Sequence, residues 1–121
     1  MSDTRKMLGS FGENEAQKYL EDQDYKILEK NFKCSHGEID IIASQEKELV
    51  FIEVRTRSSL SFGEPYESIN KVKQKRLIKL AQYYLKYKNI KNCNMRFDVV
   101  SVLADKRDFK IKKIELIKNA F

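Results

Sequence analysis

The sequence predicts a mixed α/β protein in which a β-sheet is flanked by helices, with elements in the order α-β-β-β-α-β-β. Two observations support this class. Two long segments place apolar residues at helical spacing, and five short segments are rich in the β-branched and aromatic residues typical of strands. Strands interrupted by one long helix fit a mixed sheet with helices packed on it. The length of 121 residues suits one hydrophobic core, so we expect a single domain over residues 1–121.

The first helix is predicted over residues 9–23, where Ala16, Tyr19 and Leu20 recur at helical spacing. Leu8 lies one or two turns earlier on the same apolar stripe. The second helix is longer, and its stripe consists of Leu77, Leu80, Ala81, Tyr84 and Leu85.

The strands are predicted over residues 25–33, within 37–57, and over 95–103 and 109–117. The segment 37–57 contains two of them. Because the first three strands have short connections, we expect them to form an antiparallel meander. The long helix over 69–88 then acts as a crossover, which can bring the fourth strand back parallel to an earlier one.

The composition excludes several classes of protein. The apolar runs are far shorter than the ~20 residues of a membrane helix, and "MSDTRKMLGS" lacks the apolar part of a secretory signal. We therefore expect a cytoplasmic protein with no membrane partner. Cys34 and Cys93 form no Cys-x-x-Cys pair, so two reduced thiols are expected rather than a zinc site. His36, beside a turn glycine, is expected to take no part in chemistry.

Charged residues interrupt the strand pair "GEIDIIASQEKELVFIEVRTR". Side chains of a strand alternate between its two faces. Alternation therefore predicts that each strand has one face that carries the charged residues and one face that is wholly apolar. On the first strand, the charged face consists of Glu38, Asp40 and Ile42, and the apolar face of Ile39, Ile41 and Ala43. On the second strand, the charged face consists of Phe51, Glu53 and Arg55, and the apolar face of Val50, Ile52 and Val54.

A tight hairpin turning at residues 46–47 fixes which side chains lie opposite each other. In that register Ile42 faces Phe51 and Asp40 faces Glu53, and Glu38 faces Arg55. A shift of the register by two residues would leave each side chain on the same face of the sheet but would change which residue lies opposite it. A shift by one would place the acids against the hydrophobes and is disfavoured.

Two opposed carboxylates destabilise a sheet by up to roughly 1 kcal/mol, so some other interaction must compensate for their repulsion. A divalent metal bound between them would do so, and hard oxygen ligands of this kind suit Mg²⁺ or Mn²⁺. The alternative is a salt-bridged polar face in which Arg55 neutralises Glu38 or Glu53. The pattern alone leaves both open.

The ordered motifs "GSFGENEAQKYL", "GEIDII", "VFIEVRTR", "FGEPYESI", "RFDVV" and "NAF" cover nearly the whole chain. In this order they resemble the YraN-like family of small bacterial proteins. That family is regarded as a group of predicted endonucleases in the PD-(D/E)XK superfamily, distantly similar to archaeal Holliday-junction resolvases. The resemblance implies a restriction-endonuclease-like sheet and a Mg²⁺- or Mn²⁺-dependent endonuclease acting on DNA, on branched or flapped forms among others.

The resemblance also implies the roles of individual residues. Asp40 and Glu53 would be metal ligands, together with the backbone carbonyl of Val54. Glu13 would complete the site through the metal or a water; helical periodicity alone does not choose it over Glu15. Resolvase-like relatives often dimerise, because symmetrical junctions suit two-fold enzymes, which makes a homodimer an expectation.

Arg55 occupies the position of the superfamily's lysine. Arginine stays protonated in proteins, so it cannot serve as the general base. It can still orient the scissile phosphate and stabilise the charge of the transition state. The base would then be a hydroxide held by the metal or a phosphate of the substrate.

The net charge of +6 agrees with a nucleic-acid partner and equally with an ordinary basic surface. The sequence does not choose between DNA and RNA. Residues expected to contact nucleic acid are Arg57, Lys71, Lys73, Gln74, Lys75 and Arg76, and the alternative is a solvated helix face. A polar loop with Phe62, Gly63 and Pro65 separates the two regions.

Two further sets of residues are candidates for a function. The tyrosines Tyr83, Tyr84 and Tyr87 could stack on bases, but packing is the expected role, most clearly for Tyr84 on the apolar stripe. Arg96 and Asp98 share a strand face and are expected to form a structural pair. The sequence thus supports two main functions, a metal-dependent nuclease or a non-catalytic nucleic-acid-binding module on the same fold, and a weaker third, a protein-interaction domain whose charges only keep it soluble.

Overall fold

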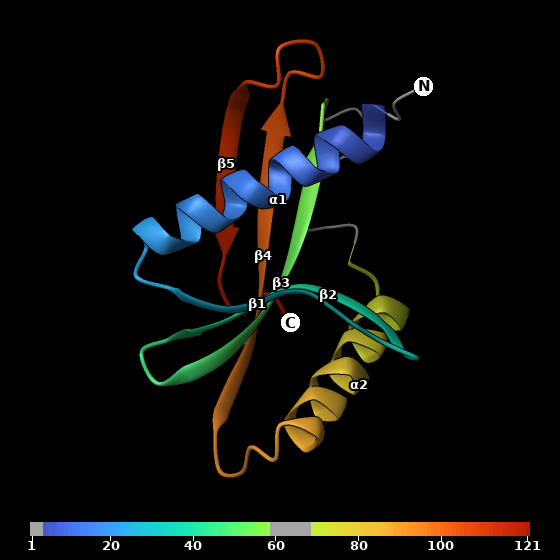
Figure 1. Ribbon diagram of the computed structural model, residues 1–121, viewed down its shortest axis with the longest axis vertical. Coiled ribbons are helices and arrows are strands. Elements are labelled where there is room, and N and C mark those ends of the chain that lie inside the picture. The colour runs from blue at the N-terminus through green and yellow to red at the C-terminus, as the bar shows by residue number, and fades with distance from the viewer. Residues whose placement is uncertain (1–3, 59–68) are drawn as a thin grey trace.

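A computed structural model describes residues 4–58 and 69–121 of the chain (Figure 1). Its elements follow the predicted order: α1 Thr4–Asp22, β1 Lys26–Cys34, β2 Gly37–Gln45, β3 Glu48–Arg57, α2 Lys71–Tyr87, β4 Asn94–Ala104 and β5 Ile111–Ile117. The strands form a sheet in the order β1-β2-β3-β4-β5. β3 and β4 pair in parallel, and the other neighbours are antiparallel. The predicted meander and parallel crossover are both confirmed.

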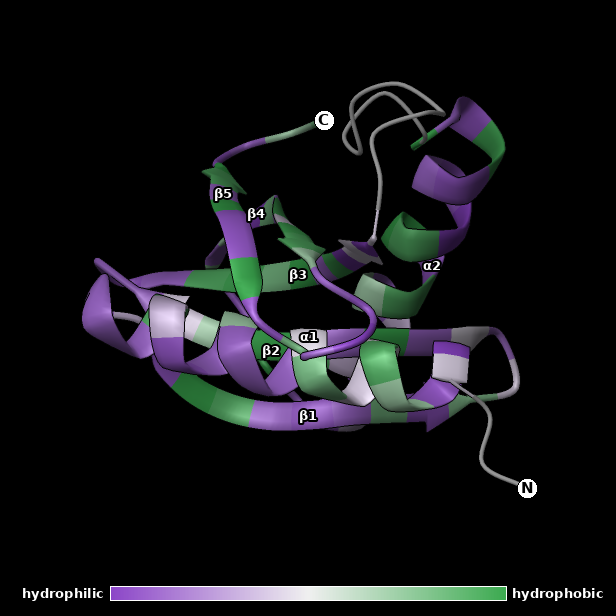
Figure 2. Ribbon diagram, turned by 90° about the horizontal axis from the view of Figure 1, so that it is seen from above, coloured by the Kyte–Doolittle hydropathy of each residue, from purple (hydrophilic) through white to green (hydrophobic). Residues whose placement is uncertain are grey.

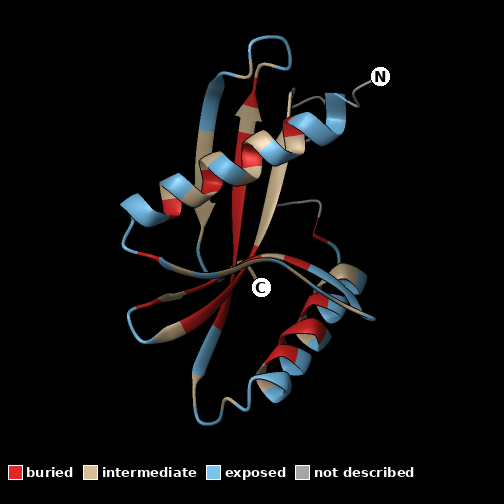
Figure 3. Ribbon diagram, viewed as in Figure 1, coloured by how far each residue is buried: buried red, intermediate tan, exposed pale blue. Residues whose placement is uncertain are grey.

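The two helices cover opposite faces of this sheet (Figure 1). Buried residues follow the central strands and one side of each helix, and the outer sides of the helices are exposed (Figure 3). Hydropathy agrees with this pattern of burial, since hydrophobic residues gather on the inner strands of the sheet (Figure 2). The arrangement is a mixed α/β fold consistent with a restriction-endonuclease-like fold.

The core consists of one apolar cluster on each face. On the α1 face Leu8, Ala16 and Leu20 pack against residues of β2, β3 and β4. These include Ile41, Ala43, Val50, Ile52, Val100 and Val102. On the α2 face the predicted stripe residues Leu77, Leu80, Ala81 and Tyr84 pack against Ile39, Ile42, Phe51 and Phe97. Burial on both faces explains why β4 reads as a nearly continuous apolar run.

Helix α1 begins at Thr4, earlier than the prediction of residue 9. Its buried residues recur every four positions, at Leu8, Gly12, Ala16 and Leu20. Bringing Leu8 into the core requires an additional turn, because a side chain joins the stripe only when its own turn is helical. The predicted stripe residue Tyr19 is only partly buried.

The β2–β3 hairpin has the predicted register. Ile42 pairs with Phe51, and the paired ladder runs from Gln45↔Glu48 to Ile41↔Ile52. The two turn residues Glu46 and Lys47 have φ values of 50° and 66°. Two left-handed residues suit a two-residue hairpin turn, whose twist matches that of the strands. The ladder ends at Ile41↔Ile52, so the predicted oppositions of Asp40 with Glu53 and of Glu38 with Arg55 lie beyond the paired residues.

The expected alternation along β2 is wrong at Ile39. This residue packs with Ile42 on the α2 face, whereas Ile41 and Ala43 pack on the α1 face. Ile39 therefore does not share a face with Ile41, as strict alternation required. The backbone of β1 is irregular beside this point: Phe32 pairs with Ile39, and the preceding residue Asn31 has a φ of 54° and is left out of the pairing.

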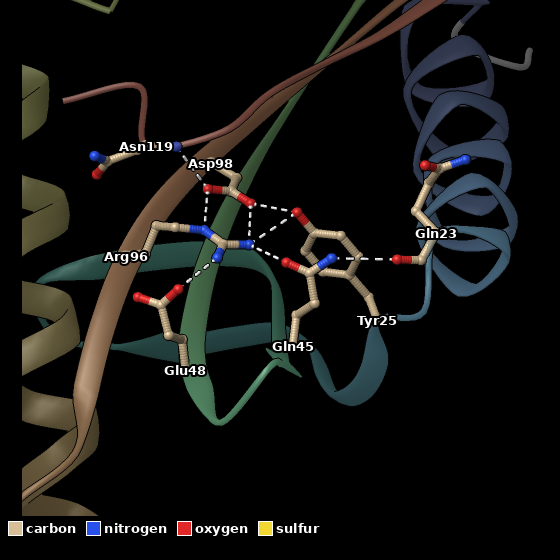
Figure 4. A network of polar contacts seen from close by, with 7 residues as sticks. All are labelled: Gln23, Tyr25, Gln45, Glu48, Arg96, Asp98 and Asn119. Atoms are coloured by element: carbon tan, nitrogen blue, oxygen red, sulfur yellow. Dashed lines mark hydrogen bonds and ion pairs between the residues drawn. The ribbon is translucent and has the colours of Figure 1, made fainter.

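The predicted pair Arg96–Asp98 is confirmed, and it belongs to a larger buried network (Figure 4). Arg96 Nε donates to Asp98 Oδ1 at 2.9 Å, and its other nitrogens reach Glu48, Gln45 and Tyr25. Tyr25 also donates its hydroxyl proton to Asp98 at 2.7 Å. The network ties the segment after α1 to the β2–β3 turn and to β4. It raises the pKa of Arg96, chiefly through the hydrogen bond to Asp98.

Neither described helix is long and apolar enough to span a lipid bilayer.

Candidate functional site

The candidate site lies where β2 and β3 separate. Beyond Ile41↔Ile52 the ladder stops, and the Asp40 side chain takes over as acceptor. Asp40 Oδ2 accepts a hydrogen bond from the backbone N–H of Val54 at 2.8 Å. The carboxylate thus lies in the opening between the strands. In a continued ladder Asp40 would pair with Glu53, and its side chain instead bonds to the next residue, Val54.

Asp40 is close enough to Glu53 for the Glu53 carboxylate to affect the protonation of Asp40. The pKa of Asp40 is raised to about 8, first by burial and then by the nearby Glu53 carboxylate. The Val54 hydrogen bond opposes this rise, and Glu13 adds a smaller contribution to it. The Glu53 side chain is itself only 13% exposed. Two carboxylates in a shared, poorly solvated space favour either a proton or a cation between them.

Helix α1 contributes Glu13 to the same region. Burial raises the pKa of Glu13, followed by the charge of Glu38, while Lys30 acts in the opposite direction. The side-chain amide of Asn31 lies between the two glutamates, 2.8 Å from Glu13 Oε1 and 2.9 Å from Glu38 Oε1, so its nitrogen can donate to both. Glu13 is therefore held by β1, with Asp40 and Glu53 as more distant neighbours.

A close approach of α1 to β3 places Glu13. Gly12 is buried, and a Cβ atom added there would overlap Thr56 Oγ1 and lie 2.7 Å from Thr56 Cγ2. Only glycine allows this approach. The next residue, Glu13, is thereby brought beside the β3 segment that follows Glu53.

Helix α2 begins at the same site. Lys73 Nζ lies 3.4 Å from Glu53 Oε2, so this ammonium balances part of the acidic charge. Asn70 caps the helix by accepting the N–H of Lys73 at 2.9 Å. Gln74, predicted to contact nucleic acid, donates its side-chain amide to Ile69 O at 3.0 Å and so helps to hold the helix start.

Two open hollows flank Glu13. One, of about 260 Å³, is lined by Glu13, Val54, Arg55 and Arg57 together with Gly9 and Thr56. The other, of about 630 Å³, includes Lys30, Lys33 and Glu38. Asp40 and Glu53 line neither of these two hollows. The predicted residues Arg55 and Arg57 line the smaller one beside Val54, whose N–H donates to Asp40.

The residues present suit a magnesium-type ion in number and kind. Within residues 4–58 and 69–121, no group of three or more His, Cys, Asp and Glu side chains is arranged to hold a metal. Mg²⁺ usually takes only one or two protein carboxylates and keeps several waters. Asp40 and Glu53, with the Val54 carbonyl, would meet that requirement. A positive group already lies at these carboxylates, since Lys73 Nζ is 3.4 Å from Glu53 Oε2.

The remaining predicted contacts are distributed around the start of α2. Lys71, Lys75 and Arg76 are exposed, and Arg57 is partly buried at the end of β3. Their contact with nucleic acid stays a prediction. The predicted loop residues Phe62, Gly63 and Pro65 lie outside the described residues.

Sequence reasoning missed two residues of β1: Asn31, whose amide lies beside Glu13, and Lys30, whose charge lowers the pKa of Glu13. One signal was available for Asn31: asparagine is depleted in strands and tolerates left-handed backbone, so its place inside a predicted strand indicated an irregularity. Lys30 Nζ donates to Asn14 Oδ1 at 3.1 Å, a contact between β1 and α1 that no sequence pattern marks.

The family profile and the similar proteins found by comparison all point to the same protein family. The profile of the uncharacterised protein family UPF0102 matches residues 12–102. A UPF0102 protein of Moorella thermoacetica is 48% identical over 121 residues, which is all of both chains. One of Caldanaerobacter subterraneus is 44% identical over 117 residues, 97% of this chain and 96% of the relative. One of Clostridium beijerinckii is 45% identical over 121 residues, covering all of this chain and 98% of the relative. The chain therefore belongs to the uncharacterised protein family UPF0102, the YraN-like family that its sequence motifs indicated.

Proposed function

We propose that this protein is a metal-dependent endonuclease that hydrolyses phosphodiester bonds of DNA in the cytoplasm. The observation that supports this most is the pairing of Asp40 with Glu53 at the point where β2 and β3 separate. Two neighbouring carboxylates destabilise the sheet by repelling each other, and a bound cation would offset this repulsion. The ion would be Mg²⁺ or Mn²⁺, since all the available ligands are oxygens.

Each residue near the pair has a defined part in this proposal. Asp40 and Glu53 bind the ion, and the Val54 N–H fixes the orientation of the Asp40 carboxylate. When bound, the ion supplies a more acidic water and neutralises phosphate charge. Arg55, permanently charged, orients the scissile phosphate and stabilises the negative charge that develops on it. Glu13, kept protonated more readily by burial, can exchange a proton with a water at the edge of the site.

The cations around α2 would position the substrate. Lys71, Lys75 and Arg76 are exposed near the N-terminal half of the helix. Contacts of this kind bind the phosphate backbone without reading sequence and weaken as salt increases. They are accordingly expected to set affinity rather than the rate of hydrolysis.

A second candidate function is a non-catalytic nucleic-acid-binding module. It is favoured by Arg55, which replaces the superfamily's lysine, and by the absence of a three-side-chain metal group among the described residues. This candidate predicts salt-dependent binding of nucleic acid with no turnover and no requirement for metal. Metal dependence of cleavage separates the two.

The test is a cleavage assay with Mg²⁺ or Mn²⁺ on single-stranded, duplex, flapped and four-way DNA. Asp40→Asn and Glu53→Gln preserve shape and remove charge. Each should reduce the rate of cleavage by at least about 100-fold, because charge stabilisation by a metal amounts to several kcal/mol.

Glu46→Gln is the matched control, because Glu46 is an exposed carboxylate in the turn at the other end of the same hairpin. It should cleave like the parent protein. Cleavage that persists undiminished in Asp40→Asn would contradict the assignment. Cleavage by no form of the protein, with retained DNA binding, would favour the binding module.

A further inference from the structure

A group of aromatic rings lies on the surface beside β1, outside the site described above. Tyr83 and Tyr87 lie one turn apart on α2 and are 40% and 64% exposed. Their ring planes are 10° from parallel, with centroids 6.2 Å apart. The Phe32 ring of β1 lies 6.3 Å from Tyr83 and 6.2 Å from Tyr87, and His36 lies 5.9 Å from Tyr83.

The exposed rings are not needed to fill the core. Tyr84, between them on the helix, does that work: it is buried and meets Phe32 edge-on at 5.1 Å and Phe51 at 5.9 Å. The expected packing role thus holds for Tyr84 and not for its two neighbours. Tyr83 and Tyr87 instead present nearly parallel ring faces at the surface.

These rings border an open hollow of about 540 Å³, whose other side is the strand β1. The cations Lys30 and Lys33 line it, and Lys88 Nζ lies 5.5 Å from the centre of the Tyr87 ring. The hollow contains one carboxylate, Glu29, which is balanced by Lys88 at 3.6 Å. Its character is therefore aromatic and basic.

Shared lining residues link this hollow to the two hollows beside Glu13. Lys30, Asn31 and Lys33 line it and also line the hollow that contains Glu13 and Glu38. Glu13 in turn lines the smaller hollow together with Val54 and Arg55. β1 is an edge strand of the sheet, so no strand of the described part of the chain pairs with its outer side. A nucleic-acid strand that crosses β1 along these lysines would lead from the aromatic rings to Glu13 and Val54.

We propose that this aromatic and basic hollow binds unpaired nucleotides of the strand whose phosphodiester bond lies at Asp40 and Glu53. The proposal rests on the proposed nuclease function and specifies its substrate: DNA with a single-stranded segment next to the scissile bond. Phosphate contacts need only cations, whereas exposed parallel rings suit the faces of bases that have left a duplex. The lysines would carry the phosphates between the bases and the site.

The test measures binding without divalent metal, so that it does not depend on cleavage. The probe is a duplex with about six unpaired nucleotides, within the length that such surfaces commonly bind, and with 2-aminopurine among them. A blunt duplex of the same sequence is the comparison. The parent protein should prefer the overhang and quench its fluorescence by stacking.

The double variant Tyr83→Ala/Tyr87→Ala should lower the ratio of overhang to blunt affinity by about tenfold or more, and Tyr83→Phe/Tyr87→Phe should restore it. Both residues are exposed, so equal melting temperatures are expected and exclude misfolding as the cause. An unchanged ratio in the alanine variant, or no restoration by phenylalanine, would overturn the proposal. So would a change in sedimentation without a change in DNA affinity, which would make the patch a contact between copies of the chain.

The two proposals fail separately in this design. If the alanine variant loses overhang binding and no form of the protein cleaves DNA, the nucleotide-binding role of the hollow is supported and the nuclease function is refuted. If cleavage needs Asp40 and overhang binding does not depend on the tyrosines, the nuclease function is supported and the nucleotide-binding role of the hollow is refuted.

Discussion

The backbone N–H of Val54 donates a hydrogen bond to Asp40 Oδ2 at 2.8 Å, at the place where β2 and β3 stop pairing. A side chain of one strand thus replaces the backbone of that strand as the acceptor. The hydrogen bond draws the Asp40 carboxylate into the sheet opening beside Glu53. The site therefore depends on an interruption of the sheet and not on a regular ladder.

The first prediction concerns the pH dependence of the metal-free protein. Burial and Glu53 raise the pKa of Asp40 to about 8, against about 3.9 in an unfolded chain. Between these values the folded state holds a proton that the unfolded state has released. The free energy of unfolding should therefore fall as pH rises from about 4 to about 8.

Asp40→Asn cannot ionise and should flatten this part of the profile by at least about 1 kcal/mol, since one pKa unit equals about 1.4 kcal/mol. Urea unfolding in the presence of a chelator, at pH 5 and pH 8, measures the effect. Glu46→Gln, exposed in the turn, should follow the parent protein. A parental slope in Asp40→Asn would show that Asp40 is not the titrating group.

The second prediction concerns Lys73, whose ammonium lies 3.4 Å from Glu53 Oε2. In the absence of metal it supplies the positive charge near Glu53, so it competes with a divalent ion. Lys73→Met should tighten Mn²⁺ binding several-fold, as expected when a competing charge is removed from a mostly buried carboxylate. Lys75→Met removes the same charge from an exposed position of the helix and should change the Kd for Mn²⁺ little. Equal effects of the two substitutions would argue against a metal at Glu53.

The third prediction concerns the contact between α1 and β3. Gly12→Ala would force a methyl group onto the Thr56 side chain and should destabilise the protein by about 1–3 kcal/mol. Gly9→Ala lies in the same helix with nothing within 4 Å, so it should be neutral or stabilise by up to about 1 kcal/mol. Thermal unfolding of the two variants compares them directly. A stable Gly12→Ala protein would mean that α1 does not approach β3 this closely.

The fourth prediction concerns the buried network of Figure 4. Asp98 is 1% exposed and accepts hydrogen bonds from Arg96, Tyr25 and the backbone N–H of Asn119. Asp98→Ala leaves the Arg96 charge buried without its main counterion, which should cost about 3–5 kcal/mol. Glu115→Gln breaks the exposed pair with Lys113 and should cost less than about 1 kcal/mol. Denaturant unfolding distinguishes them, and comparable losses in both would contradict a structural role for the network.

Much of the fold was predictable because local patterns agree with it. Alternation and short connections fixed the meander, and the apolar faces fixed the pairing of Ile42 with Phe51. The face of Ile39 was not predictable, because strict alternation assumes a regular strand, and the neighbouring strand has a left-handed residue, Asn31, beside the partner of Ile39. The predicted start of α1 at residue 9 was too late, although Leu8 had been placed on the apolar stripe, because no apolar residue of that stripe marks the first turn from Thr4.

The site was predictable in part for the same reason. The spacing in the hairpin brought Asp40 toward Glu53, and the family resemblance chose Glu13 over Glu15. The link from Asn31 to Glu13 and Glu38 joins three elements and leaves no periodic signal. The network of Tyr25, Gln45 and Arg96 likewise joins residues far apart in the chain, so only Arg96 and Asp98 could be paired in advance.

The central claim is that Asp40 and Glu53 bind one divalent ion. Calorimetric titration of the parent protein and of Asp40→Asn with Mn²⁺ tests it most directly. We predict one Mn²⁺ per chain for the parent protein and a loss of at least about tenfold in affinity for Asp40→Asn, as ligand shells of metal sites typically show. Equal Mn²⁺ binding by the two proteins, or none by the parent protein, would contradict the claim.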